Sequence, residues 1–449
     1  MKKSKFASLL AVWVCLLVFG GIAAADAPVY EAQPSVEFKV REGIGRTLAK
    51  LRAGETVNVA YLGGSITMAN GWRPKTTAWL QSAWPNAKVN EIHAAISGTG
   101  SYLGLYRLKR DVLDHDPDLL FVEFAVNDGG VAPDQEWAQM ESIVRQTWEK
   151  DPTTDIVFVF TFCVNFTQSV RDGFLPRSAS AMELLADHYG IPSINFMKRV
   201  VAMESAGQLA FTPGAVPQSV NPAPNASNPS ASAVSAPAET NAPMLWSKDG
   251  THPLEAGHEL YLQDVQRAFA AMESLPPADH AAKMAHPFTE NFIQGARMID
   301  VTPEMLSGNW QPVAPNDRIY GFGRFLGTIW STDEPGAKLT FRFRGQEAQL
   351  YDVVGPTAGQ VRVTVDGQPL EKPLSRCDSY CVNYYSFRIT SSFIVRDLDP
   401  AKEHLVELEL LPEEPDRAKM ADGKLVRPEE TLQEKYRGRR LWIGKILVR

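Results

Sequence analysis

Hydrophobic positions in the first two thirds of the chain follow two alternating patterns. Short apolar runs typical of buried strands occur at residues 57–62, 88–96, 119–126, 155–162 and 191–196. Between them, segments such as "YLGLYRLKRDVLDH" and "EWAQMESIVRQTWEK" repeat apolar residues at the three-to-four-residue spacing of amphipathic helices. Strands that alternate with helices favour right-handed crossovers and a parallel sheet with helices on both faces. We therefore predict an α/β domain over residues 26–285.

The pattern changes after about residue 288. Runs such as "LTFRFRG", "QVRVTVDG" and "HLVELELL" alternate apolar and polar residues, and Asp366-Gly367 is a strong turn signal. Helical spacing is absent between these runs. Successive strands without intervening helices are typical of a β-sandwich, which we predict over residues 288–449.

The first 25 residues carry the features of a secretory signal peptide. A basic start, "MKKSK", precedes an apolar run that ends in the small residues "AAADA". We predict cleavage near Ala25 and a secreted or periplasmic protein that does not associate with a membrane after cleavage. An uncleaved membrane anchor is the alternative.

A second segment of unusual composition interrupts the α/β pattern. Residues 212–243 are rich in Pro, Ala, Ser and Asn and contain little that a core could bury. We predict a disordered loop there.

Charge and cysteine content narrow the classes of partner and cofactor. Removing Lys2, Lys3 and Lys5 with the signal peptide leaves 42 basic residues of 45 against 52 acidic residues, a net charge of about −10. An acidic chain of this kind argues against nucleic acid as a partner. The "CDSYC" segment allows either a Cys377–Cys381 disulfide or two free thiols. No His/Cys cluster has metal-ligand spacing, so we expect no metal and no cofactor.

Small and polar residues follow three of the predicted strands. Ser65 comes after residues 57–62, Gly98 after 88–96, and Asn127 after 119–126. Because the carboxyl ends of parallel strands meet at one edge of the sheet, these residues are expected to converge on one crevice. The segment "DGTHP", just before the last amphipathic helix, adds Asp249 and His252.

These residue types supply what acyl transfer requires. The Ser65 hydroxyl needs an adjacent base to act as a nucleophile, and His252 can provide it. Asp249 can fix the tautomer of the imidazole and stabilise its charged form. The backbone N–H groups of Ser65 and Gly98 and the amide of Asn127 can form an oxyanion hole, in which one donor is worth about 3 kcal/mol.

The blocks "GGSIT", "ISGTGS", "VND" and "DGTHP", in this order, resemble the four blocks of the SGNH (GDSL) hydrolase superfamily. The resemblance implies a flavodoxin-like three-layer α/β/α fold, Ser65 as nucleophile, Gly98 and Asn127 as oxyanion donors, and Asp249 and His252 as triad partners. Two positions depart from the family pattern, because Gly64 replaces the common Asp and Ala125 replaces a Gly. Gly100 competes with Gly98 for the donor role.

Four neighbouring residues have a structural interpretation beside a functional one. His258 rivals His252 as the base, but its place in the final helix favours a structural role. Asp128 is interpreted as a capping carboxylate. Trp72 and Arg73 either line a substrate pocket or belong to the core and to a solvated surface.

Export, acidity and an added β-sandwich together favour a carbohydrate ester as substrate. The C-terminal region is similar in outline to the jelly-roll or carbohydrate-binding-like modules of some SGNH carbohydrate esterases, and Trp310, Tyr320 and Trp330 are candidate sugar-stacking residues beside their core alternative. We predict a serine esterase that removes O-acetyl or other short acyl groups from a polysaccharide or oligosaccharide. The alternatives are a lipid- or thioester-directed acyl hydrolase and a carbohydrate-binding protein with an inactive hydrolase domain.

Overall fold

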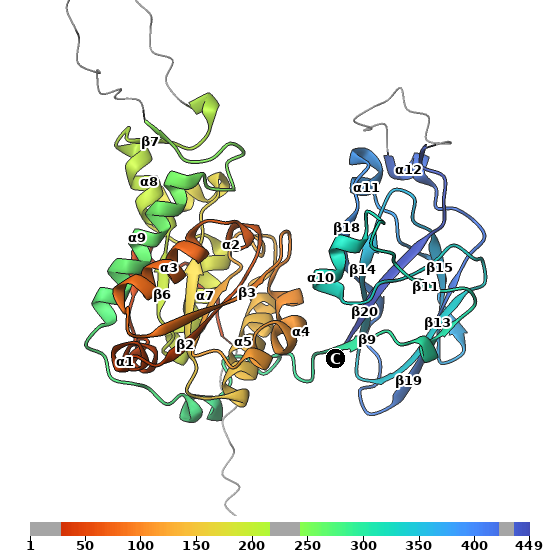
Figure 1. Ribbon diagram of the computed structural model, residues 1–449, viewed down its shortest axis with the longest axis horizontal. Coiled ribbons are helices and arrows are strands. Elements are labelled where there is room, and N and C mark those ends of the chain that lie inside the picture. Colours follow the sequence, from red (N-terminus) through yellow and green to blue (C-terminus); the bar gives the residue numbers. More distant parts are fainter. Residues whose placement is uncertain (1–27, 216–242, 422–434) are drawn as a thin grey trace, which may run out of the picture.

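The computed structural model describes residues 28–215, 243–421 and 435–449 (Figure 1). The predicted signal peptide and nearly all of the predicted disordered loop therefore lie outside the described residues. None of the helices in the described part of the chain is long and apolar enough to cross a membrane.

The N-terminal domain is built on one sheet. Five strands run parallel, and a short sixth strand pairs antiparallel to β6 at the edge: β2 (Thr56–Gly63), β3 (Lys88–Ala95), β4 (Leu119–Glu123), β5 (Asp155–Phe160), β6 (Ser193–Asn195) and β1 (Phe38–Lys39). Their spatial order is β1-β6-β5-β4-β2-β3. The parallel strands thus have the flavodoxin-like order, and the predicted fold class is confirmed. The strand order reverses between β2 and β4, the position at which such folds bind ligands.

Helices cover both faces of this sheet (Figure 1). The helices are α1 (Gly45–Ala53), α2 (Ser65–Met68), α3 (Trp72–Ala83), α4 (Ser101–Asp111), α5 (Pro133–Lys150), α6 (Thr167–Arg171), α7 (Arg177–Tyr189), α8 (Met197–Ser205) and α9 (Glu255–Met272). α3 packs on α9, whereas α4 and α7 pack on α5. The central strands are buried along their whole length, which explains why their sequences read as continuous apolar runs. A short pair of parallel strands, β7 (Leu209–Ala210) and β8 (Met244–Leu245), flanks the segment that is not described.

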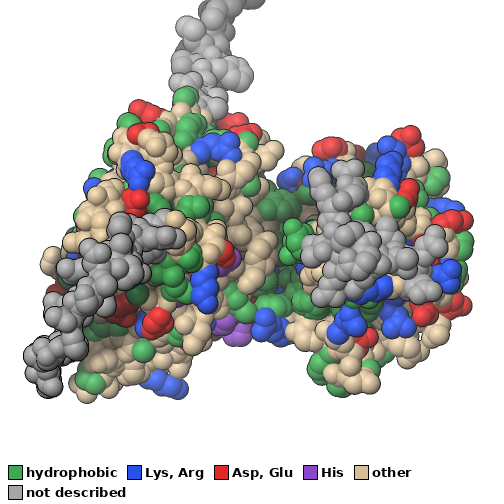
Figure 2. All heavy atoms as spheres, turned by 90° about the horizontal axis from the view of Figure 1, so that it is seen from above, with side chains coloured by type: hydrophobic (Ala, Val, Ile, Leu, Met, Phe, Trp, Pro, Cys, Tyr) green, Lys and Arg blue, Asp and Glu red, His purple; other side chains and the backbone are tan. Residues whose placement is uncertain are grey.

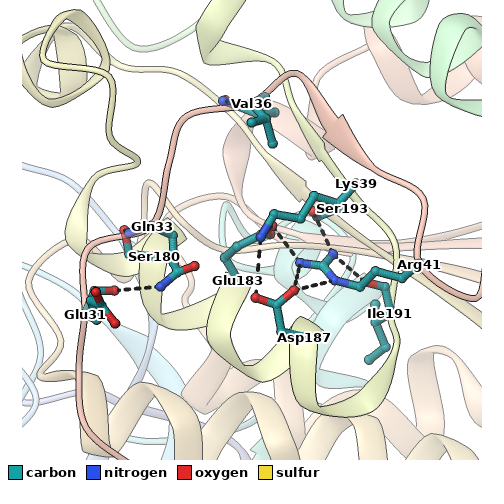
Figure 3. A network of polar contacts seen from close by, with 11 residues as sticks. Glu31, Gln33, Val36, Lys39, Arg41, Ser180, Glu183, Asp187, Ile191 and Ser193 are labelled. Atoms are coloured by element: carbon teal, nitrogen blue, oxygen red, sulfur yellow. Dashed lines mark hydrogen bonds and ion pairs between the residues drawn. The ribbon is translucent and has the colours of Figure 1, made fainter.

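Ion pairs hold the edge strand β1 to helix α7 (Figure 3). The Arg41 guanidinium lies 2.6 Å from the buried Glu183 carboxylate and 2.7 Å from that of Asp187. It also donates to the Ile191 carbonyl at 2.7 Å. Because Glu183 is buried, its pairing with Arg41 and Lys39 offsets the desolvation of the carboxylate.

The C-terminal domain is a sandwich of two antiparallel sheets. The first contains β10 (Leu306–Ser307), β13 (Lys338–Arg344), β15 (Gln360–Val365), β16 (Gln368–Pro369), β17 (Leu374–Ser375) and β19 (Glu403–Leu410). The second contains β9 (Arg297–Asp300), β11 (Gln311–Pro312), β12 (Trp330–Thr332), β14 (Ala348–Val354), β18 (Arg388–Val395) and β20 (Leu441–Val448). Three short helices lie between strands: α10 (Gly323–Leu326), α11 (Ser379–Tyr384) and α12 (Arg417–Ala421).

Burial differs between the two sheets in a way that shows how the domains meet. Strands β15 and β19 alternate buried and more exposed residues, as expected for a sheet with one face in water. In contrast, β14 and β20 are buried at every position. Leu350 and Ile446 face the sandwich interior, whereas Tyr351 and Leu447 belong to the hydrophobic cluster of the N-terminal domain. The outer face of the second sheet is therefore an interdomain surface.

Polar contacts reinforce this surface. The buried Glu347 carboxylate accepts hydrogen bonds from the hydroxyls of Tyr102 and Tyr106 on α4 and pairs with Arg449 at 3.0 Å. Arg110, also on α4, donates to the Phe325 carbonyl at 2.7 Å. Helix α4 is thus fixed to the sandwich near both of its ends.

The structure decides two of the alternatives that the sequence left open, those for the two cysteines and for Trp310. Cys377 and Cys381 carry free thiols within the described residues, so no disulfide joins them. Trp310 is buried in the sandwich, which assigns it to the core. Tyr320 is 51% exposed and remains available at the surface.

Candidate active site

The turn after β2 places Ser65 at the start of helix α2, at the carboxyl edge of the sheet. Gly64 precedes it, and a Cβ atom at this position would lie 2.0 Å from Oδ1 of Asn127. The Asn127 side chain thus occupies the space that a side chain at position 64 would enter.

Ser65, His252 and Asp249 form one hydrogen-bonded series. The distance from Ser65 Oγ to His252 Nε2 is 2.8 Å, and the distance from His252 Nδ1 to Asp249 Oδ2 is 2.6 Å. Ser65 and His252 are 187 residues apart in the sequence and meet because the loop before α9 returns to the edge where β2 ends. This geometry lets the imidazole take a proton from the hydroxyl while its other nitrogen donates to the carboxylate.

The Asp249 carboxylate is held in place by its own loop. Its Oδ1 accepts from the backbone N–H groups of Thr251 and His252, both at 2.9 Å, and from the Ser247 hydroxyl at 2.9 Å. Desolvation acts to raise the pKa of Asp249, but these hydrogen bonds and the one from the imidazole hold that pKa well below its usual range. The Asp249 carboxylate is therefore ionised at neutral pH and can accept the hydrogen bond from His252 Nδ1. Ser247 was not singled out in the sequence, and its only signal there is its position two residues before Asp249.

The three predicted oxyanion donors lie on turns at the same sheet edge. Gly98 has φ of +73°, a left-handed conformation that favours glycine, and it is exposed in the turn after β3. Asn127 is exposed in the turn after β4, with its amide group against Gly64. The rival Gly100 is the N-cap of α4. Gly98 rather than Gly100 lines the cleft described below.

A buried carboxyl group beneath the nucleophile is a feature that the sequence analysis missed. Glu123, at the end of β4, is 1% exposed. It accepts hydrogen bonds from the Thr67 and Thr161 hydroxyls, both at 2.8 Å, and from the Gly64 N–H at 3.3 Å. Glu123 therefore connects the turn that carries Ser65 to the strands on either side. The signal was available, because Glu123 is the only charged residue in the apolar run 119–126.

Glu123 should make stability depend on pH. Burial raises its pKa to about 7, above the ordinary value of 4.5, so the folded protein keeps a proton that the unfolded chain has lost between these pH values. The free energy of unfolding should therefore fall as pH rises from 4.5 to 7, by roughly 3 kcal/mol from this group.

The test compares the wild type with Glu123→Gln by urea unfolding at pH 5 and pH 8. Because other titrating groups cancel in the difference, the variant should gain stability relative to the wild type at pH 8. An equal difference at both pH values would show that Glu123 does not titrate in this range.

The comparisons with known proteins agree with this site. Residues 61–260 match the model of the GDSL-like lipase/acylhydrolase family. The N-terminal domain is a GDSL-like acylhydrolase domain. A search of curated proteins finds no match to the chain.

Solved structures extend the likeness to both domains. The chain is similar to a two-domain esterase active on acetylated mannans, in crystals grown with mannopentaose (18% identity, TM-score 0.64, covering 92% of this chain and 98% of that chain). A second structure of an esterase with that description gives 17% identity and a TM-score of 0.65, covering 91% of this chain and 95% of that one. The likeness in fold therefore extends over both domains of this chain.

Near the GDSL-like site, the structural interpretations of His258, Asp128 and Trp72 hold, whereas that of Arg73 as a solvated surface residue is wrong because Arg73 is buried. His258 is buried, and its Nδ1 accepts from the Trp72 N–H at 3.2 Å. Asp128 accepts from the Ser101 N–H, at the first residue of α4. Trp72 is wholly buried, and Arg73 is buried and paired with Glu91. Trp72 and Arg73 thus belong to the core and its margin.

A cleft between the two domains begins at the catalytic edge. Its volume is about 380 Å³, and both domains line it. The GDSL-like domain contributes Met68, at the end of the Ser65 helix, and Gly98. The sandwich contributes Phe325, Tyr380 and Phe387. Viewed onto the groove, the space-filling picture shows a hollow between the domains with many hydrophobic side chains in it (Figure 2).

Within the described residues, no group of three or more His, Cys, Asp and Glu side chains is arranged to hold a metal ion. The described groups at the site are those of proton transfer and acyl transfer.

Proposed function

We propose that this protein is a secreted or periplasmic serine esterase that removes O-acetyl or other short acyl groups from a carbohydrate. The hydrogen-bonded series Ser65–His252–Asp249 carries the proposal, because its distances of 2.8 and 2.6 Å are those of a nucleophile, its base and the group that orients the base. Its place in a GDSL-like acylhydrolase domain assigns the chemistry to ester hydrolysis.

In the first half of the reaction, Ser65 Oγ attacks the ester carbonyl as His252 Nε2 takes its proton. The imidazolium formed is stabilised by Asp249, which accepts from Nδ1. Negative charge develops on the carbonyl oxygen, which the Ser65 and Gly98 N–H groups and the Asn127 amide would stabilise. His252 then returns the proton to the departing sugar hydroxyl, and an acyl-Ser65 ester remains.

The second half repeats these steps with water. His252 takes a proton from a water molecule that attacks the acyl carbonyl, and the same donors stabilise the intermediate. Collapse of the intermediate returns the proton to Ser65 Oγ and releases the carboxylic acid.

The shared cleft supports a carbohydrate as the acyl carrier. It is open at the surface and combines aromatic rings with polar groups from two domains, the combination that sugar rings with their hydroxyl edges require. The esterase similar to this chain over 92% of its length is described as active on acetylated mannans, which favours an acetylated carbohydrate as the substrate here. The basic and apolar N-terminus supports export.

The experiment that tests the function is acetate release by residues 26–449 from acetylated mannan, xylan and pectin fragments. Acetate should be released from at least one of them. Hydrolysis of long-chain acyl esters in preference to every acetylated carbohydrate would instead assign the protein to the lipid-directed acyl hydrolases. Binding to a polysaccharide without release of acetate from any substrate would favour a binding protein.

Substitution of Gly64 tests the oxyanion proposal. Gly64→Ala places a Cβ atom 2.0 Å from Asn127 Oδ1, so the Asn127 amide must move away. Losing one such donor should lower kcat for a small acetate ester by about 10²-fold.

Gly130→Ala is the matched control, because a Cβ atom there meets no other atom within 4 Å and Gly130 lies in the same loop as Asn127. Its kcat should stay near the wild-type value. Equal kcat values for the two variants would show that Asn127 is not an oxyanion donor.

A further inference from the structure

Three arginines of the sandwich stand over aromatic rings of the interdomain cleft. The Arg324 guanidinium lies 4.3 Å from the centre of the Phe325 ring, and Arg318 lies 5.2 Å from that of Phe387. Arg388 lies 5.3 Å from the centre of the Tyr380 ring. All three rings line the cleft that begins at Met68 and Gly98 of the GDSL-like domain. Stacking orients each guanidinium while leaving its N–H donors at the edge of the plane.

Arg318, Arg324 and Arg388 form a cationic wall in which one of the three charges is neutralised locally. Arg388 pairs with Asp378 at 2.6 Å. Within the residues that the structure describes, neither Arg318 nor Arg324 has a carboxylate partner, and both are exposed. The whole chain carries a formal charge of −7, so the positive charge of this wall is opposite in sign to the net charge of the chain.

Arg324 occupies the position at which two cavities meet. It lines the cleft at Gly98 and also a neighbouring cavity of about 400 Å³ beside His93 on the edge strand β3. Burial, and then the positive charges of Arg73, Arg324 and Arg107, lower the pKa of His93 to about 4. Arg324 therefore lies beside both cavities, and Met68 at the end of the Ser65 helix lines both of them as well.

We propose that the substrate is an anionic carbohydrate, whose carboxylate or sulfate group binds the stacked guanidinium group of Arg324 in the cleft while an O-acyl group lies at Ser65. This inference rests on the proposed function and adds the charge of the substrate. Arginine presents a planar fork of donors that matches a carboxylate or a sulfate. A neutral sugar chain gives such unpaired cations nothing of opposite charge to bind.

The test measures kcat/KM for three acetylated oligosaccharides of similar length: a galacturonide, a sulfated galactan fragment and a neutral mannan fragment. The wild type should prefer at least one anionic substrate. Preference for the galacturonide would identify a carboxylate as the bound group, and preference for the sulfated galactan would identify a sulfate. Arg324→Gln should lower kcat/KM for that substrate about tenfold, the size of a lost charge-assisted hydrogen bond, and lower the ratio of kcat/KM for the anionic substrate to that for the neutral fragment by a similar factor. Raising the salt concentration should reduce the wild-type preference.

Arg342→Gln is the matched control, since Arg342 lies on β13, is 60% exposed and pairs with Glu403 away from the cleft. It removes the same charge from the same domain and should leave the preference intact. A wild type that hydrolyses the neutral fragment as well as the anionic ones, or an Arg324→Gln variant that loses activity equally on all substrates, would overturn the inference while the esterase proposal stands. Hydrolysis of 4-nitrophenyl acetate but of no oligosaccharide would overturn both.

Discussion

Ser65→Ala should abolish turnover of any ester, lowering kcat by about 10⁶-fold as in enzymes whose nucleophile acts as part of a unit with its base. The alanine removes only Oγ, the atom that lies 2.8 Å from His252 Nε2. Among the described residues, the one hydrogen bond of Ser65 Oγ is the one it donates to His252 Nε2, so the fold should be preserved. The rate of 4-nitrophenyl acetate hydrolysis measures the effect.

Ser82→Ala provides the control for this change, because Ser82 is an exposed residue of α3 with no base beside it. It should have wild-type activity, and both variants should melt near the wild-type temperature. Ester hydrolysis that survives in a folded Ser65→Ala protein would mean that another group is the nucleophile.

Asp249→Asn should lower kcat by about 10⁴-fold with little change in the loop. An asparagine Oδ1 can still accept from the Thr251 and His252 N–H groups, which fix the turn. Its NH₂ group would face His252 Nδ1 and donate to it, which puts the imidazole proton on Nε2 and leaves no lone pair for the Ser65 hydroxyl.

Asp151→Asn is the control for loop geometry. Asp151 also caps its own turn, accepting from the Thr153 N–H at 2.9 Å, but no histidine contacts it. A wild-type kcat for Asp151→Asn together with a much lower kcat for Asp249→Asn would show that the loss comes from the carboxylate that contacts the His252 imidazole. Wild-type kcat for Asp249→Asn would show that the base acts without an acidic partner.

The parts of the fold that depend on local pattern could be predicted from the sequence. The runs at residues 119–126 and 155–162 are continuous because β4 and β5 are buried on both faces, and burial of this kind leaves an unambiguous apolar signature. The sequence could also propose site residues. Ser65 and Asn127 each follow a predicted strand, and His252 precedes a predicted helix, so the position of each in the fold could be inferred from the apolar pattern around it. Strand order was open, since nothing in a strand's own residues specifies its neighbour; only the resemblance implied it.

The features that could not be predicted arise from contacts between distant elements. Tyr102 donates a hydrogen bond to Glu347, which lies 245 residues further along the chain, and the sequence around neither residue predicts this contact. The cationic wall is assembled from Arg318 in a loop, Arg324 on α10 and Arg388 on β18. Arg324 and Arg388 line one cleft with Gly98 only because the two domains pack together. The sequences of β14 and β20 lack the apolar–polar alternation of β15 and β19, because β14 and β20 are buried on both faces. This missing alternation was the one sequence feature that pointed to an interdomain surface.

The measurement that tests the central claim most directly is covalent capture of the nucleophile. The mature protein is treated with a fluorophosphonate, a reagent that reacts with serines activated by a neighbouring base, and the labelled peptide is mapped by mass spectrometry. One adduct on Ser65 is expected, absent from Ser65→Ala and strongly slowed in His252→Ala. A label on another residue, or no label on the folded protein, would contradict the assignment of Ser65, His252 and Asp249 as the catalytic unit.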